Sequence, residues 1–378
     1  MKIAYLLGSL NRGGTETLLL DVFRNAKQNE LEAMGIYRKS GSLELDFRQS
    51  GVEMAQLPVG ENPLAYLIKL RELLVRNKIS IVHAQQPIDA LFAWLACLGT
   101  GMKIALTFHG YDFNDKKTGA SILKFIIKRT DANLFVSEMQ RQYYQQQYSL
   151  KAEKQTVVYN GISFDKLNML THWMTLSHPM SNLRNELNIL PDTLLIGSVG
   201  NFVPVRDQLT LCRFLKLLDE QEVDFHFVFI GKRAENKPDL YDDCYNFCQQ
   251  NNLLDRVSFL GSRNDVPALL HQLDAFLYAT DHDTFGIAVV EAMAVGIPVF
   301  VNDWEVMTEV TDRGKYATLY KTKEDVDLLQ QFMLFLQNKT PYKTKALEAA
   351  RFVREMYSIE KHIENLKQVY RRLMMNGK

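Results

Sequence analysis

The stretch from residue 283 to residue 299 reads DTFGIAVVEAMAVGIPV, and two carboxylates interrupt an otherwise apolar or small run. Asp283 and Glu291 are separated by seven residues. Burying an unpaired charge is costly, so a carboxylate in an apolar helix either has a partner in the protein or faces a ligand. This stretch is therefore the first candidate for a binding site.

A short helix is predicted inside this stretch. Gly286 stands near its start, Gly296 is a C-terminal stop and Pro298 follows, which leaves a helix of about ten residues. The backbone N–H groups of Phe285, Gly286 and Ile287 lie at its positive end. Groups of this kind hold phosphate oxygens, so we expect an anion here.

The two carboxylates suit the remainder of such a ligand. Glu291 lies about one turn into the helix, where it can accept hydrogen bonds from a diol. Asp283 precedes the helix and can reach hydroxyls on the other side of a diphosphate. The arrangement predicts a nucleotide-sugar, with phosphates at the helix end, the ribose at Glu291 and the sugar near Asp283.

A glycine-rich turn follows the first predicted strand. Gly13 and Gly14 precede Thr15, a good N-cap residue, and the helical stretch ETLLLDVFRNAKQ. Consecutive glycines let a backbone approach a phosphate, although a plain tight turn explains them equally well. The dinucleotide fingerprint G-x-G-x-x-G is absent.

Two isolated polar side chains also follow predicted strands. His109 stands where a strand gives way to Gly110, although a lone histidine is more often a capping or core residue. Arg206 falls just before or within the first turn of a helix, where a cation opposes the positive helix end. A bound anion would remove this conflict. A solvent-facing arginine paired with Asp207 or another acid is the alternative.

Metal ligands are not indicated. Cys244 and Cys248 form C-x3-C without a second ligand pair at zinc spacing, so we expect two core-facing cysteines on one helix. Asp281 and Asp283 fit a D-x-D pattern only formally. The four cysteines of the chain fit a reducing, cytoplasmic setting.

Short β-rich runs alternate with helical patterns along two parts of the chain. The candidate strands are KIAYLLG, EAMGIYR, ISIVHAQ, KIALTFHG, ANLFVS and QTVVYNG, then LLIGSVGN, FHFVFIG, RVSFLG, AFLYAT and PVFVN. This alternation predicts βαβ units and parallel sheets, so the fold class is α/β with two consecutive domains. Residues 162–191 show no clear strand and indicate an interdomain connection.

The predicted domains are residues 1–178 and residues 179–357, and a helix over 358–378 ends the chain. Apolar residues of this helix recur at a spacing of three to four from Ile359 to Leu373. Ligands of open α/β sheets bind beyond the carboxyl ends of the strands. The cleft between two such domains is therefore the expected site.

Composition is ordinary for a soluble globular protein, with 47% hydrophobic and 23% charged residues. The formal net charge of zero argues against nucleic acid, and no apolar run reaches the roughly 18 residues needed to span a bilayer. The first residues read as a strand and not as a signal peptide. Residues 1–178 carry 21 Lys and Arg against 16 Asp and Glu, so contact with an anionic membrane surface is an alternative to ordinary scatter.

These motifs together resemble retaining glycosyltransferases of the GT-B fold, family 4, also called glycosyl transferases group 1. Their signature is an acid, one residue, Phe-Gly and an apolar run into Glu-Ala-Met-Ala, which residues 283–294 match. The similarity covers nearly the whole chain through GGTE at 13–16, TFHG at 107–110, VVYNGI at 157–162, VGNFVPVRDQ at 199–208 and RVSFLG at 256–261.

The resemblance implies two Rossmann-like, doubly wound parallel-sheet domains facing a central cleft. The first would bind the acceptor and the second the donor, with the last helix packed back on the first domain. Arg206 would neutralise the leaving diphosphate, His109 would lie near the donor sugar and Asp283 would hold its hydroxyls. The implied donor-binding residues are Gly13, Gly14, Asn201, Lys232, Leu260, Phe285, Gly286, Ile287 and Glu291.

Two positions depart from the family pattern. The first acid is usually Glu and is Asp283 here. An Arg and a Lys often flank the diphosphate, and Asn201 and Arg206 stand in their places. One cation is therefore expected to provide most of the neutralisation, with Lys232 or Arg233 in support.

The implied reaction moves a sugar from a nucleotide-sugar, a UDP-sugar by expectation, to a saccharide or lipid-linked acceptor in cell-surface polysaccharide biosynthesis. No metal and no cofactor are expected, and the expected location is the cytoplasm, with peripheral contact to the inner membrane surface left open. The alternative is a sugar-nucleotide 2-epimerase or glycosyl phosphorylase of the same fold. A periplasmic-type sugar-binding protein would need a secretion signal, and an NAD-dependent dehydrogenase would need the missing glycine fingerprint.

Overall fold

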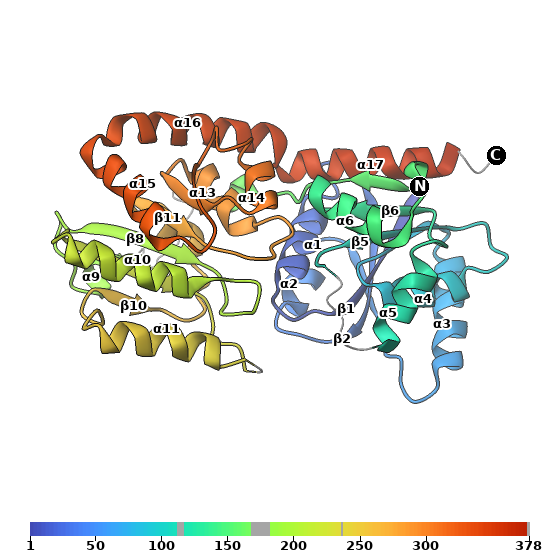
Figure 1. Ribbon diagram of the computed structural model, residues 1–378. Coiled ribbons are helices and arrows are strands. Elements are labelled where there is room, and N and C mark those ends of the chain that lie inside the picture. Colours follow the sequence, from blue (N-terminus) through green and yellow to red (C-terminus); the bar gives the residue numbers. More distant parts are fainter. Residues whose placement is uncertain (112–116, 168–181, 236, 376–378) are drawn as a thin grey trace. The chain divides into compact units, whose positions relative to one another are not determined.

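The computed structural model describes residues 1–111, 117–167, 182–235 and 237–375 (Figure 1). The chain divides into two compact units. Unit 1 comprises Met1–Ile162 with Tyr357–Lys378, and unit 2 comprises Ser163–Met356. The chain therefore leaves unit 1 once and returns to it for its last helix. The domain boundary expected at residue 178 lies outside the described residues.

The described part of unit 1 contains a seven-stranded parallel sheet of order β3-β2-β1-β4-β5-β6-β7. Its strands are β1 (Lys2–Ser9), β2 (Glu32–Lys39), β3 (Glu53–Gln56), β4 (Ile79–Ala84), β5 (Lys103–Phe108), β6 (Ala132–Phe135) and β7 (Gln155–Val157). Its helices are α1 (Gly14–Arg24), α2 (Glu44–Arg48), α3 (Pro63–Arg76), α4 (Pro87–Ala96), α5 (Lys117–Ile126), α6 (Glu138–Tyr148), η1 (Ala152–Lys154) and α17 (Ile359–Met375).

Alternation along β1 explains why helices cover both faces of this sheet. Successive side chains of a strand point to opposite faces. Ile3, Tyr5 and Leu7 enter the core beneath α1, α2 and α17, whereas Ala4 and Leu6 enter the core beneath α3 and α4. A strand buried on both faces reads as the continuous apolar run that the sequence shows, as is usual for parallel sheets.

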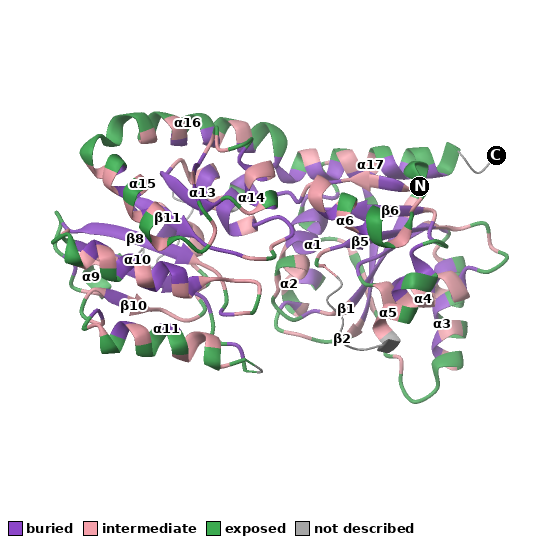
Figure 2. Ribbon diagram, viewed as in Figure 1, coloured by how far each residue is buried: buried purple, intermediate pink, exposed green. Residues whose placement is uncertain are grey.

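The last helix, α17, completes the core of unit 1. Its buried side chains belong to the same cluster as those of β1, α1 and α2, and Figure 2 shows one side of the helix buried and the other exposed. They follow the spacing of three to four residues seen in the sequence. The core residues of α17 are Ile359, Ile363, Leu366, Val369, Tyr370 and Leu373.

The described part of unit 2 contains a six-stranded parallel sheet of order β10-β9-β8-β11-β12-β13. Its strands are β8 (Leu194–Val199), β9 (Phe225–Ile230), β10 (Val257–Phe259), β11 (Ala275–Tyr278), β12 (Val299–Asn302) and β13 (Thr318–Tyr320). Its helices are α7 (Phe164–Leu167), α9 (Leu183–Glu186), α10 (Gln208–Glu220), α11 (Asp239–Gln250), α12 (Val266–Leu270), α13 (Ile287–Val295), α14 (Glu305–Val310), α15 (Asp325–Gln337) and α16 (Lys339–Met356).

Each sheet reverses its strand order once, between β1 and β4 in unit 1 and between β8 and β11 in unit 2. Ligands of doubly wound sheets bind beyond the carboxyl ends of the strands at such a reversal. The loops after these four strands are therefore the places where the fold positions functional side chains. The predicted pair of Rossmann-like parallel sheets is confirmed.

The core of unit 2 explains the cysteine pair. Cys244 and Cys248 lie on α11 and are buried, as is Cys212 on α10. The expectation of two core-facing cysteines is confirmed. Over the described ranges, no helix combines the length and the apolar character needed to cross a membrane.

Candidate active site

Helix α13 has the predicted glycine boundaries. Gly286 and Gly296 both adopt left-handed conformations, with φ of +79° and +82°. A Cβ atom on Gly286 would lie 2.7 Å from Cε of Met307, so backbone conformation and space both favour glycine there. Most of the helix is buried, and Glu291 is half-buried one turn from its start. The predicted helix is confirmed.

The first turn of α13 carries the backbone N–H groups at which the sequence predicts an anion. The first N–H groups of a helix have no intrahelical partner, which applies to Ile287 and the residue after it. The Val290 N–H already donates a hydrogen bond to the carbonyl of Gly286. The Phe285 N–H is directed instead at Oδ1 of Asp283, 3.4 Å away. The amides at the start of the helix proper are therefore better placed for a ligand than that of Phe285.

Asp283 is the centre of a hydrogen-bonded cluster after β11. Its Oδ1 accepts from the Thr284 N–H at 2.8 Å and from the Phe285 N–H. Its Oδ2 accepts from Nη1 of Arg206 at 2.7 Å and from the hydroxyl of Tyr278. A carboxylate offers about four lone-pair sites, so protein groups occupy all of them.

The loop of residues 203–207 brings Arg206 to this cluster. Its backbone pairs with the segment after β11 through an Arg206–Thr280 bridge and an N–H donated by Asp281 to the carbonyl of Val205. The Thr280 hydroxyl also donates to that carbonyl. Two loops that follow neighbouring strands β8 and β11 are thus tied together, which places Arg206 and Asp283 side by side.

Arg206 is held on two sides. Its side chain is 17% exposed and that of Asp283 15% exposed, so the ion pair between them is mostly shielded from water. The guanidinium carbon lies 4.4 Å from the ring centroid of Tyr278, a cation–π contact. Arg206 is therefore paired with an acid, as one alternative foresaw, but it is not solvent-facing. Asp207, the other proposed partner, caps α10 by accepting the Thr210 N–H.

Three of the implied donor-binding residues lie in loops at the same edge of this sheet. Oδ1 of Asn201 accepts from the Lys232 N–H at 3.0 Å, which links the loops after β8 and β9. The Leu260 N–H, after β10, donates to the carbonyl of Phe229. The Lys232 side chain is exposed, whereas Arg233 makes a two-point ion pair with Asp242. Lys232 is thus the better placed of the two supporting cations.

Two glycines permit the close approach of these loops. A Cβ on Gly231 would lie 2.0 Å from the carbonyl oxygen of Gly200, so no side chain fits there. A Cβ on Gly200 would lie 3.3 Å from Nε of Arg206. These two glycines were not identified from the sequence. Each directly follows an apolar strand, and a glycine in that position is the sequence pattern that could have identified them.

The two carboxylates of the formal D-x-D pattern have separate partners. Asp281 pairs with Lys323 at 3.0 Å and Asp283 pairs with Arg206, so each carboxylate faces its own cation. Within the described ranges, no group of three or more His, Cys, Asp or Glu side chains is arranged to hold a metal ion.

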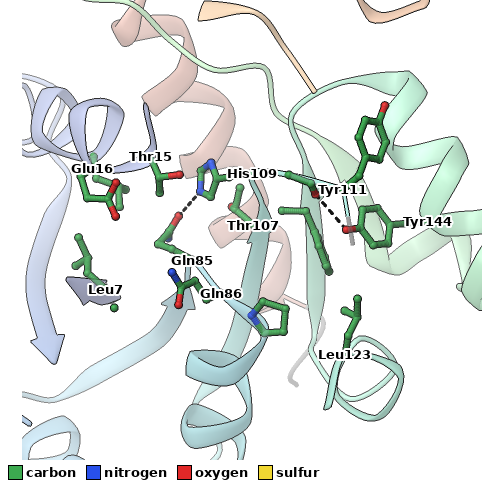
Figure 3. A pocket seen from close by; sticks show the side chains of 15 residues that line it. Leu7, Thr15, Glu16, Gln85, Gln86, Thr107, His109, Tyr111, Leu123 and Tyr144 are labelled. Atoms are coloured by element: carbon green, nitrogen blue, oxygen red, sulfur yellow. Dashed lines mark hydrogen bonds between the residues drawn. The ribbon is translucent and has the colours of Figure 1, made fainter. Parts of the chain in front are cut away.

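Unit 1 has a pocket at the carboxyl ends of its strands, with a volume of about 230 Å³ (Figure 3). Ligand pockets for drug-sized molecules run to ~300–1,000 Å³, so this one suits a smaller group. Five polar side chains of its lining come from the first turn of α1 and from the loops after β4 and β5, and they are Thr15, Glu16, Gln85, Gln86 and His109.

His109 lines this pocket directly after β5. Its Nε2 lies 2.8 Å from Oε1 of Gln85, an oxygen that only accepts, so Nε2 carries the proton (Figure 3). Burial and the nearby His362 lower the pKa of His109 to about 3, so the imidazole is neutral near pH 7. The Tyr144 hydroxyl and the Gln140 amide both donate to the carbonyl of Gly110 and fix the turn that follows.

A buried polar chain connects the pocket with α17. Nε2 of His83 lies 2.7 Å from the hydroxyl of Thr107, which lines the pocket, and Nδ1 lies 2.7 Å from the hydroxyl of Tyr370 on α17. The Tyr370 hydroxyl in turn lies 2.8 Å from that of Tyr5 on β1. The position of Thr107 therefore depends on the last helix of the chain.

The glycine turn lies beside this pocket. Helix α1 begins at Gly14 with Gly13 as its N-cap, so the expected Thr15 cap is wrong and the helix starts two residues earlier. A Cβ on Gly13 would lie 2.6 Å from Oε2 of Glu16. Burial raises the pKa of the Glu16 carboxyl, the one acidic side chain among the residues that line the described pocket.

The predicted site residues thus gather in two groups. Unit 2 brings Arg206, Asp283, Phe285 and Gly286 into one cluster, with Asn201, Lys232, Leu260, Ile287 and Glu291 in neighbouring loops and on α13. Unit 1 brings His109 to a pocket beside Gly13 and Gly14. Tyr278 was missed, because an aromatic residue at the end of an apolar strand reads as core.

Two Rossmann-like parallel sheets, each with one strand-order reversal, define a fold of the GT-B class. The crystal structure of Anabaena HepE in complex with UDP and glucose has this fold. It matches with a TM-score of 0.83 at 18% identity, over 99% of this chain and 100% of that one.

The family model described as "Glycosyl transferases group 1" matches residues 179–352, and the one described as "Glycosyltransferase Family 4" matches residues 12–166. The chain belongs to the group 1, family 4 glycosyltransferases and is a glycosyltransferase.

Two similar glycosyltransferases come from Escherichia coli. The O-antigen biosynthesis glycosyltransferase WclY is 25% identical over 83% of each chain. The UDP-Gal:alpha-D-GlcNAc-diphosphoundecaprenol alpha-1,3-galactosyltransferase is 23% identical over 80% of this chain and 79% of the relative.

Proposed function

We propose that this glycosyltransferase uses a UDP-sugar, retains the anomeric configuration and transfers the sugar to a saccharide or lipid-linked acceptor in cell-surface polysaccharide biosynthesis. The observation that carries the proposal is the juxtaposition of Arg206 with the start of α13 at the strand-order reversal of unit 2. A cation and free helix amides suit a leaving diphosphate. UDP in HepE, the lipid-linked substrate named for the galactosyltransferase and the O-antigen role of WclY support the substrate classes.

The proposed mechanism follows from charge development in the transition state. The bond from the sugar to the diphosphate breaks, and the diphosphate leaves with the electron pair. The acceptor hydroxyl oxygen bonds to the same sugar carbon, and its proton passes to the leaving phosphate oxygen. Negative charge grows on the phosphate oxygens as the first bond breaks, and positive charge grows on the sugar. Arg206 and the amides at the start of α13 stabilise the first charge, which grows most as the bond breaks. His109, neutral and hydrogen-bonded to Gln85, holds a donor hydroxyl or the developing positive charge. We assign no enzyme nucleophile.

The proposal requires no metal and no cofactor. Asp281 and Asp283, the two carboxylates of the formal D-x-D pattern, each pair with a cation. Arg206 and Lys232 are the cations proposed to neutralise the diphosphate in place of a metal.

The ribose role of Glu291 gives the first test. Glu291 is half-buried one turn into α13, close to the proposed phosphate position. Glu291→Gln should keep the fold and weaken UDP binding about tenfold, because a carboxylate accepts stronger hydrogen bonds than an amide. Calorimetric UDP titrations of both proteins measure this. Equal affinities would contradict the ribose role.

A panel of nucleotide-sugars tests the reaction itself. The proposed function predicts thermal stabilisation by UDP-sugars and transfer of the sugar to an acceptor with the anomeric configuration retained, as read by NMR of the product. Interconversion of the donor without transfer would favour the epimerase alternative. Stabilisation by NAD alone would contradict the proposal.

Membrane contact and a cytoplasmic location are also proposed. Leu64, Ile68 and Val75 lie four and seven residues apart on α3 and are 66%, 51% and 54% exposed. This spacing places them on one face of the helix, flanked by the exposed Arg71 and Glu72. An exposed apolar stripe suits a lipid surface, where a lipid-linked acceptor would reside.

A further inference from the structure

The contacts of Tyr278 distinguish it from Tyr320, the other buried tyrosine in the described part of unit 2. It is the last residue of β11 and is 1% exposed. Its ring lies under the guanidinium of Arg206, and its hydroxyl donates to Asp283. A side chain that only filled the core would need neither contact.

Arg206 depends on these contacts for its orientation. An arginine side chain has many rotamers, and holding it costs conformational entropy unless neighbouring groups fix it. Asp283 binds one edge of the guanidinium through Nη1, and Tyr278 covers one face. A guanidinium carries five N–H donors, so an edge remains for a second oxyanion. Its buried Nε has no hydrogen-bond partner among the described residues.

Asp283 in turn depends on Tyr278. Backbone N–H groups of Thr284 and Phe285 fix one carboxylate oxygen, and the Tyr278 hydroxyl and Arg206 share the other. Removing the hydroxyl would leave the second oxygen with one donor. The carboxylate could then rotate, and the guanidinium would follow it.

We propose that Tyr278 is a positioning residue that aims Arg206 at the donor diphosphate, by stacking under its guanidinium and by fixing Asp283. The proposal rests on the proposed function, because it takes Arg206 as the cation for the diphosphate. Tyr278 itself touches no ligand in this scheme. Its effect on binding passes entirely through Arg206.

This dependence is tested by a double-mutant cycle on UDP affinity, measured by calorimetry. The proteins are the wild type, Tyr278→Phe, Arg206→Ala and the double variant. Arg206→Ala should weaken UDP binding about 30-fold or more, the range for a hydrogen bond to a charged group. Tyr278→Phe keeps the ring and should weaken binding about fivefold, since one neutral donor to a charged partner is lost. In the Arg206→Ala background, Tyr278→Phe should have no further effect.

Two variants complete the design. Tyr320→Phe removes another buried hydroxyl of the same sheet, one that donates to the carbonyl of Tyr278 and does not contact Arg206. It should leave UDP affinity within twofold, whereas a general loss of packing would affect both tyrosine variants alike. Tyr278→Leu also removes the ring and should weaken binding more than Tyr278→Phe. If the leucine variant does not fold, as a thermal melt would reveal, the cycle with phenylalanine still decides.

The outcomes separate this inference from the proposed function. If the wild type binds UDP and the Tyr278→Phe loss persists in the Arg206→Ala background, Tyr278 does not act through Arg206 and the inference is wrong. Unchanged affinity of Tyr278→Phe would also overturn it. A wild type that binds neither UDP nor any other nucleoside diphosphate would overturn the proposed function first, and the inference with it.

Discussion

Asp283 is one of the positions at which this chain departs from the family pattern, and it is the one at which the structure adds most. From the sequence, Asp283 was expected to accept hydrogen bonds from hydroxyls of the donor sugar. The structure shows a carboxylate whose oxygens already accept from two backbone N–H groups, Arg206 and Tyr278. A sugar hydroxyl must therefore replace one of these donors, or Asp283 acts on the reaction by holding Arg206.

Substitution of Asp283 distinguishes these two roles. Asp283→Asn should lose transfer with every donor. Its UDP affinity should be unchanged if Asp283 only contacts the donor sugar, and should fall if Asp283 holds Arg206. Asp283→Glu moves the carboxylate by about one bond length, and a misplacement of ~1 Å can reduce the rate about a hundredfold. If Asp283 contacts the donor sugar, this loss should differ between donors in a panel assay.

A uniform loss across all donors would instead assign Asp283 to positioning Arg206. Full activity of Asp283→Asn would contradict both roles. Asp281→Asn is the matched control, because Asp281 lies two residues away in the same loop and pairs with Lys323.

The sequence could identify Arg206 and Asp283 but not their pairing. The two residues lie 77 positions apart, and their contact arises only because β8 and β11 are neighbours in the sheet. Tyr278 was beyond sequence reasoning for the same reason. Its role depends on partners from two loops, while its local pattern is that of a buried strand. Gly286 and Gly296, by contrast, were predicted correctly because their signal is local backbone geometry.

At the scale of single elements, the start of α13 allows a stability prediction. Gly286→Ala places a Cβ at a φ of +79° and 2.7 Å from Met307. We expect a loss of about 2–3 kcal/mol in the free energy of unfolding, from left-handed strain and steric overlap together. Urea unfolding of the variant and the wild type measures this difference.

Gly99→Ala is the matched control for Gly286→Ala. Gly99 has a φ of +74°, but a Cβ there would meet no atom within 4 Å. It should lose only about 1 kcal/mol, the cost of the left-handed backbone alone. Equal losses for both variants would show that Met307 yields without cost.

The exposed stripe of α3 allows a prediction about membranes. Replacing Leu64, Ile68 and Val75 by serine should reduce binding to vesicles containing anionic phospholipid by roughly tenfold or more, because each buried CH₂ contributes ~0.8 kcal/mol. Sedimentation with vesicles measures this. Stability should change little, since these side chains are exposed.

Leu347→Ser on α16 removes an equally exposed leucine elsewhere and should leave vesicle binding unchanged. If the wild-type protein does not sediment with anionic vesicles, the membrane proposal is wrong.

Most elements were predictable because parallel strands buried on both faces give continuous apolar runs. The strands missed were β3 and β13, four and three residues long at sheet edges. The edge strands β7 and β10 are equally short, but they were identified from the longer runs QTVVYNG and RVSFLG, and no such run marks β3 or β13. Their strand conformation is stabilised by pairing with β2 and β12, which their own sequences do not reveal.

At the scale of the whole molecule, buried histidines predict acid sensitivity. Burial lowers the pKa of His83 to about 3 and that of His362 to about 4, from about 6.5 when unfolded. Both are neutral when folded, so the unfolded chain binds more protons once the pH falls below about 6.5. Their contribution is present above that pH and declines toward pH 4, by roughly 1.4 kcal/mol per pH unit for each group.

Urea unfolding between pH 7 and pH 4.5 should show this decline. His362→Asn keeps a donor for the carbonyl of Tyr159 and should flatten the pH dependence. His282→Asn, at an exposed position, should not. A pH dependence that is the same in all three proteins would exclude His362 as a source.

The place of α17 in the core of unit 1 bears on the order in which the chain can fold during synthesis. Residues 1–162 leave the ribosome first, yet their core lacks Ile363, Tyr370 and the other α17 side chains until the last residues are made. Until then His83 and Tyr5 have no Tyr370 partner, and an apolar face of the sheet is uncovered. Unit 2 is continuous in sequence, so its core is complete once residue 356 has been synthesised. The first part of the chain to be synthesised is therefore the last to be completed, and a nascent or truncated chain that ends before residue 357 should be the form most dependent on chaperones.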